Sequence, residues 1–217
     1  MTELPRLRDL IALTLRSPRQ AAGHLIALNL SRGILWQALL LVVILSVLAA
    51  QVSVLVSFGT LSPMLDTGEG MISPLFASPL VLGLMQGVLL LISILATYWI
   101  GRAMGGTGSF EAIEAARAEG VEAVQVTVCW LQFMMLCLQL VQILLSLLIP
   151  PLGAMIGMAG IVVFFWLFTQ FVTVVHGFRN PGLVFLAILL SLTGFVLGVS
   201  ILMASLGITF MGEIPDV

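Results

Sequence analysis

Charged side chains are scarce in this chain, and lysine is absent altogether. Only 8% of the 217 residues are charged, whereas 60% are hydrophobic. A soluble domain carries about 25% charged residues, because a water-soluble fold needs a polar exterior. The composition therefore excludes a single soluble domain and predicts an integral membrane protein.

Other residue types are also scarce, and their absence excludes several classes of function. The formal net charge is −2, so the chain lacks the basic footprint of a nucleic-acid-binding protein, and we expect no nucleic-acid partner. The two cysteines, Cys129 and Cys137, lie in one apolar run without the His or carboxylate neighbours of a metal or redox site. We expect no cofactor and no enzyme, since no nucleophile–base pair or pair of pocket carboxylates is evident.

Long runs without charge define the predicted spans. About 20 apolar residues cross a bilayer, so the uncharged run 123–178 is long enough for two crossings. The sequence Ile149-Pro150-Pro151 divides it, because proline removes backbone donors and biases the preceding residue away from the helix. The fold class is therefore all-α, a polytopic membrane helix bundle with five spans. They are expected at about 34–58, 79–101, 124–149, 152–175 and 182–208.

The arginines support this count of five. Five of the eight precede the first span, Arg102 and Arg117 lie between the second and third, and Arg179 lies between the fourth and fifth. Under the positive-inside rule every arginine then falls on one side. We expect a cytoplasmic N-terminus and an external, periplasmic tail over 211–217. Arginine as the only strong base is typical of GC-rich bacterial genomes, so we expect the bacterial inner membrane.

Residues 1–32 predict a cytoplasmic amphipathic segment. Leu7, Ile11 and Leu15 follow helical spacing with arginines among them, and Ser17-Pro18 is typical of the start of a second short helix, expected to run through Leu30. We interpret the segment as two interfacial helices whose partners are membrane lipids. A disordered leader is the alternative.

Polar and small residues inside the spans indicate helix contacts. Three glutamines of the third span are seven residues apart and share one helix face, and an amide facing lipid would be left unpaired. Hydrogen bonds between helices are expected, with a polar translocation path as the alternative. Three GxxxG pairs indicate close packing within the chain or between protomers. The candidate contact residues are Gln125, Gln132, Gln139, Gln142, Gly83, Gly87, Gly153, Gly157, Gly194 and Gly198.

The glycine-rich stretch 101–120 does not fit a nucleotide loop. It has no lysine for a P-loop, and its GGTG follows a membrane helix instead of a strand. A flexible turn followed by a short cytoplasmic helix over 110–118 is expected. His176 is expected at the cytoplasmic membrane interface, near Arg179.

The sequence MGGTGSFEA at 104–112, between spans two and three, resembles the Gly-Gly-x-Gly-Ser/Thr-Phe-like motif of the Yip-domain family of membrane proteins. A second likeness runs from Trp166 to His176-Gly177-Phe178, and the resemblance covers roughly 34–208. The residues that carry the motif are Gly105, Gly106, Gly108, Ser109, Phe110 and Glu111.

The resemblance implies five spans, a short cytoplasmic N-terminus and no known catalysis. Eukaryotic members of the family are associated with small Rab-type GTPases, vesicle traffic and membrane shaping. This sequence lacks their long N-terminal domain with an Asp-Leu-Tyr-Gly-Pro-like motif, so the GTPase association is not carried over to it.

Three functions are compatible with these patterns. The first is a noncatalytic membrane protein that acts through contacts with lipids, other membrane proteins or itself. The second is a small permease or channel lined by the glutamine face. The third is an accessory subunit of a larger membrane complex.

Overall fold

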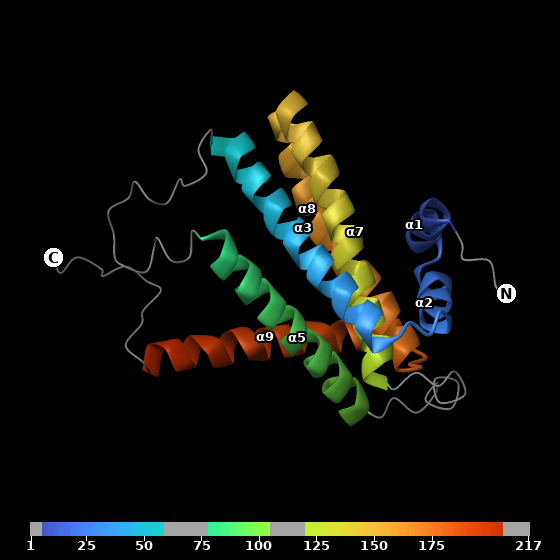
Figure 1. Cartoon of the computed structure of the whole chain (residues 1–217). Helices are drawn as coiled ribbons and strands as arrows, with labels where there is room; N and C mark the ends of the chain where they lie inside the picture. Colours follow the sequence, from blue (N-terminus) through green and yellow to red (C-terminus); the bar gives the residue numbers. More distant parts are fainter. Residues whose placement is uncertain (1–5, 59–77, 105–119, 206–217) are drawn as a thin grey trace. The chain divides into compact units, whose positions relative to one another are not determined.

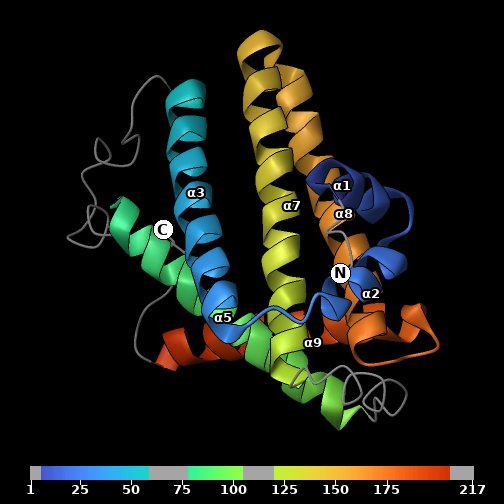
Figure 2. The same ribbon diagram turned by 45° about the vertical axis from the view of Figure 1, so that its right-hand side comes forward.

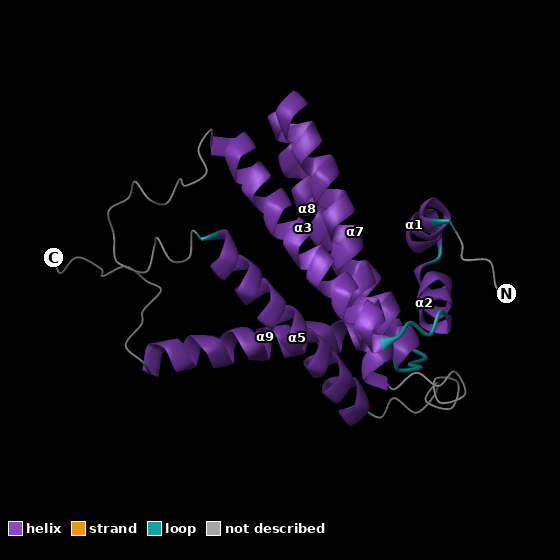
Figure 3. Cartoon of the chain, viewed as in Figure 1, coloured by secondary structure: helices purple, strands orange, loops and turns teal. Residues whose placement is uncertain are grey.

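The computed structural model describes residues 6–58, 78–104 and 120–205, and every regular element in these ranges is an α-helix (Figure 3). Five of these helices are long and apolar enough to cross a membrane. The chain divides into two compact units, residues 1–179 and 180–217. The predicted all-α, five-span membrane architecture is confirmed.

The centre of the first unit is a hairpin of two long helices, α7 (Gly120–Leu148) and α8 (Pro150–Val175), which lie side by side (Figure 1). Ile149 joins them in an extended conformation, with φ −144° and ψ 90°. The helix α8 begins at Pro150, two residues before the expected start. Proline suits the first turn of a helix, where no intrahelical N–H bond is needed.

The helix α3 (Arg32–Phe58) packs along α7, and α5 (Pro79–Ala103) packs on both α3 and α7. Most of the buried side chains between them are apolar, as the hydrophobic composition of the spans requires. A buried cluster joins all three helices to the end of α8. Its members include Leu39, Val42, Ile94, Val124, Val128 and Val175.

The N-terminal segment forms two short helices, α1 (Leu7–Arg16) and α2 (Pro18–Ala27). The views agree that they lie beside α7 and α8 (Figures 1 and 2), and Leu35 of α3 belongs to the same buried cluster as Leu25 of α2. Ala21 and Ala22 are fully buried there, in a cluster with Leu167 and Phe171 of α8. The second helix ends before the expected Leu30, because Asn29 adopts a left-handed backbone with φ 44°.

The second unit contains one described helix, α9 (Pro181–Ser205). Proline again occupies the first turn, and the side-chain oxygen of Asn180 accepts a hydrogen bond from the Gly182 backbone N–H at 2.9 Å. This is an N-cap, which satisfies one of the unpaired donors at a helix start. The last residues of the expected fifth span, 206–208, and the tail 211–217 lie outside the described residues.

Candidate functional site: polar and small residues at helix contacts

Two of the four candidate amides of α7, those of Gln132 and Gln142, lie at contacts with another helix. The Gln132 side-chain nitrogen donates to the Ser46 hydroxyl of α3 at 3.3 Å, which joins two spans through polar atoms. The amide of Gln142 lies against α8, because a Cβ added at Gly157 would stand 2.8 Å from its nitrogen. Gln139 is half-buried. Gln125 is buried, and its amide nitrogen finds no partner within the described ranges.

The glycines of α8 lie where α7 approaches most closely. A Cβ added at Gly153 would meet the Ser146 backbone at 2.9 Å, and one at Gly160 would meet the Leu138 side chain at 2.7 Å. Real Cβ atoms do not approach this closely. At Gly153 the near atom is backbone, so this position requires glycine for the hairpin to close, whereas at Gly160 the near atom is the tip of the flexible Leu138 side chain, which can move aside. The Gly153/Gly157 pair therefore permits close packing within one chain.

The other glycine pairs are less crowded. A Cβ at Gly83 would stand 3.6 Å from Val47 of α3, an ordinary contact distance, and one at Gly87 would meet no atom within 4 Å. In the second unit, α9 itself leaves room for a Cβ at Gly194 and Gly198. Only the pair in α8 lies at a crowded contact within the described chain.

The helix α8 ends in a tight corner. The Phe178 N–H donates to the Thr173 carbonyl at 2.9 Å, and the Gly177 N–H donates to the Val174 carbonyl at 3.1 Å. These bonds form a Schellman motif, which needs a left-handed residue, and Gly177 supplies it with φ 63°. The corner fixes the direction of the adjacent His176.

His176 is buried against α5, with 1% of its surface exposed. Its ring occupies the space that a Cβ of Gly101 would fill. Neither ring nitrogen has a hydrogen-bond partner within the described ranges. Burial of the ring lowers the pKa of His176. The nearby Thr97 backbone raises this pKa by a smaller amount. The structure places His176, which was expected at the cytoplasmic membrane interface, directly after α8 and within its contact with α5.

Sequence reasoning missed this contact. His176 follows an apolar span and Gly101 ends another, but the 74 intervening positions carry no signal that pairs them. The only sequence cue is the glycine that follows the histidine, because it predicts a helix end. Which neighbouring helix receives the ring depends on tertiary packing.

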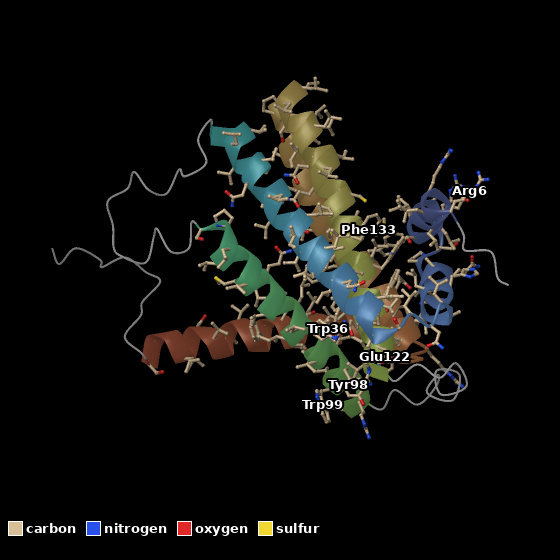
Figure 4. The ribbon with its side chains drawn as sticks, viewed as in Figure 1. Arg6, Trp36, Tyr98, Trp99, Glu122 and Phe133 are labelled. Carbon is tan, nitrogen blue, oxygen red and sulfur yellow. The ribbon has the colours of Figure 1, made fainter. Side chains whose placement is uncertain are left out.

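Charged side chains lie at the start of α3, at the start of α7 and at the end of α5. Arg32, at the start of α3, forms an ion pair of 2.5 Å with Glu122, in the first turn of α7 (Figure 4 labels Glu122). In the last turn of α5, Arg102 donates to the Tyr98 hydroxyl at 3.3 Å. The starts of α3 and α7 and the end of α5 thus carry charged residues that lie just outside the spans expected from the sequence.

The motif residues Gly105, Gly106, Gly108, Ser109, Phe110 and Glu111 lie outside the described residues. Their flanking positions belong to helices in contact, since α5 ends at Ala103 and α7 begins at Gly120. In the described part of the chain, no group of three or more His, Cys, Asp or Glu side chains could hold a metal ion.

Five apolar helices with polar residues at their contacts define a multi-pass helical membrane protein. The family model of the Yip1 domain matches residues 12–202. The chain belongs to the Yip1-domain family, as the resemblance indicated, and the match includes α2 as well as the five spans. The family is not a known family of enzymes. Neither the curated proteins nor the solved structures gave a match.

Proposed function

We propose that the protein is a noncatalytic membrane protein that acts through contacts with lipids, with other membrane proteins or with itself. The observation that carries the proposal is the placement of the span glutamines. Gln132 bonds to Ser46 and Gln142 packs over Gly157, so these amides connect helices. Amides at helix contacts stabilise a bundle and leave fewer polar groups to line a path.

The exposed side chains of α5 also support this function. Leu80, Leu84 and Trp99 each expose more than half of their surface. In a bilayer such a surface is covered by acyl chains or by another helix, and Trp99 near the helix end suits the membrane interface. A protein built to present apolar helix surfaces can act by recruiting lipids or helices.

The proposed location is the bacterial inner membrane, with the N-terminus in the cytoplasm and the C-terminus in the periplasm. Support comes from the arginines, which all lie outside the spans or in their terminal turns and fall on one side if five helices cross. Alkaline phosphatase fused after residue 217 should be active, whereas green fluorescent protein fused there should be dark. The reverse pattern would contradict the orientation.

The function itself is tested by crosslinking the full chain in native membranes and identifying the adducts after purification in mild detergent. We expect adducts to lipids, to a second copy or to other membrane proteins. The same preparation in liposomes should move neither ions nor small polar solutes.

Three results would overturn the proposal. Solute flux that Gln132→Leu and Gln139→Leu together abolish, with folding intact, would establish a permease. Migration on a native gel only within a large complex of fixed composition would establish an accessory subunit. A protein that always purifies alone and gives no adducts would also contradict it.

A further inference from the structure

The apolar face of α1 is wider than its contact with the rest of the first unit. Leu10 and Thr14 are buried, whereas Leu7 and Leu15 remain 54% and 51% exposed. Leu7 and Leu15 are eight residues apart, which places them towards the same side of a helix. This part of the apolar face requires a covering that the described chain does not provide.

Basic side chains accompany these exposed leucines. Arg6, Arg8, Arg16 and Arg19 are exposed, and Asp9 is the one acidic residue among them. The side chain of Arg6 points away from the helices (Figure 4). The segment 6–19 thus carries a formal charge of +3, four arginines less one aspartate, in a protein whose net charge is −2.

Two hydrogen bonds fix the depth of this segment. The Trp130 indole nitrogen of α7 donates to the Thr14 hydroxyl at 3.0 Å, and Arg19 Nε donates to the Gln170 side-chain oxygen of α8 at 2.7 Å. Trp130 and Gln170 each lie about 20 residues, or about 30 Å, from the turn at Ile149. That distance is the thickness of the hydrocarbon layer, so α1 and the start of α2 lie at its boundary.

We propose that α1 and the start of α2 form a binding surface for anionic phospholipid headgroups, here called the arginine surface (residues 6–19). The inference rests on the proposed function, because it names the lipid class that one contact surface takes. The arginines donate to headgroup phosphates, and Leu7 and Leu15 enter the outermost acyl region.

Arg19 is positioned for this role by a span residue. Gln170 accepts from its Nε, which holds the guanidinium beside α8 and leaves the terminal amino groups to donate to phosphate oxygens. Free phosphate would satisfy the arginines but not the exposed leucines. The adjacent apolar side chains therefore assign the surface to a lipid.

The test uses the full chain in nanodiscs that contain phosphatidylcholine and phosphatidylglycerol in equal amounts, with retained lipids counted by native mass spectrometry. The test variant is Arg8→Gln with Arg16→Gln, since both side chains are exposed and neither takes part in a helix contact shown here. The control, Arg102→Gln with Arg179→Gln, removes the same charge elsewhere.

The unaltered protein should retain phosphatidylglycerol over phosphatidylcholine. The test variant should lose about thirtyfold of this preference, since each of the two arginines contributes about 1 kcal/mol near a membrane surface. The control should lose less than twofold. Equal losses in both variants, or no preference in the unaltered protein, would overturn the inference.

A second measurement needs no substitution. A photoreactive phosphatidylglycerol should label residues 6–19 of the unaltered chain, and excess unlabelled phosphatidylglycerol should compete better than inorganic phosphate. Labels confined to other segments would contradict the arginine surface while leaving the proposed function intact. Solute flux through the protein in liposomes would instead contradict the proposed function.

Discussion

The ring of His176 lies directly on Gly101, in the space where any other residue would place its Cβ. The contact joins the corner after α8 to the last turn of α5. Only glycine leaves room for an imidazole at this position. Since the ring is buried, its removal would leave a cavity at the helix contact.

The first prediction is that Gly101→Ala destabilises the protein by about 1–3 kcal/mol, the usual cost of overpacking a close contact. The added methyl group collides with the His176 ring, which the Gly177 corner prevents from moving freely. Unfolding in detergent, followed by circular dichroism, measures the change. Gly87→Ala in the same helix is the control, because a Cβ there meets no atom.

A double variant tests whether the added methyl group acts through the His176 ring. In the His176→Ala background, Gly101→Ala should cost less than it does alone, because the ring that it displaces is gone. Additive effects of the two substitutions would show that the methyl group acts on something other than His176.

The second prediction concerns pH. Burial lowers the pKa of His176, so between that value and its ordinary pKa of about 6.5 the unfolded state binds more protons than the folded state. This contribution to stability is complete above about pH 6.5 and is lost as the pH falls. The melting temperature should therefore decrease from pH 7.5 to pH 5.5.

His176→Gln should make this pH dependence weaker. Arg179, three residues after His176, and Arg102, next to Gly101, keep their charge throughout the range. His24→Gln removes the other histidine, which is exposed, and should leave the dependence as it is. The prediction would be contradicted if the pH dependence of the melting temperature disappeared in His24→Gln but persisted in His176→Gln.

The third prediction concerns the hydrogen bond between α7 and α3. Gln132→Leu should destabilise the protein by about 0.6–2 kcal/mol, the measured range for polar contacts between membrane helices. A double-mutant cycle with Ser46→Ala should show coupling, because the two side chains share a hydrogen bond of 3.3 Å. Gln139→Leu serves as the matched control, and equal coupling to Ser46 there would contradict the assignment.

The fourth prediction concerns the attachment of α1. Trp130→Phe removes the indole donor to Thr14 while it keeps an aromatic ring, so α1 should separate from α7 more often. Amide hydrogens of residues 7–16 should then exchange faster with deuterium, by about five- to tenfold for a bond of about 1 kcal/mol. Trp36→Phe, on the exposed side of α3, should leave the exchange unchanged. Unchanged exchange in both variants would show that packing alone holds α1.

The number and type of the helices in the described ranges could be predicted from the sequence. A bilayer admits no unpaired backbone, so uncharged apolar runs of about 20 residues become helices whatever surrounds them. Proline and glycine indicate where helices begin and end: α8 begins at Pro150, and Gly177 follows its last turn. The positions of helix ends shifted by a few residues where proline in the first turn, or Glu122 beside a helix start, extends the helix.

Tertiary structure decided which residues meet. The seven-residue spacing of Gln125, Gln132 and Gln139 placed them on one face, yet only Gln132 reaches a hydrogen-bond partner on α3 in the described chain. Three glycine pairs shared one spacing, and only Gly153/Gly157 lies at a crowded contact. Periodicity fixes the side of a helix on which a residue lies, because it is a property of one helix. The neighbour on that side depends on how several helices pack, so His176 against Gly101 could be found only in three dimensions.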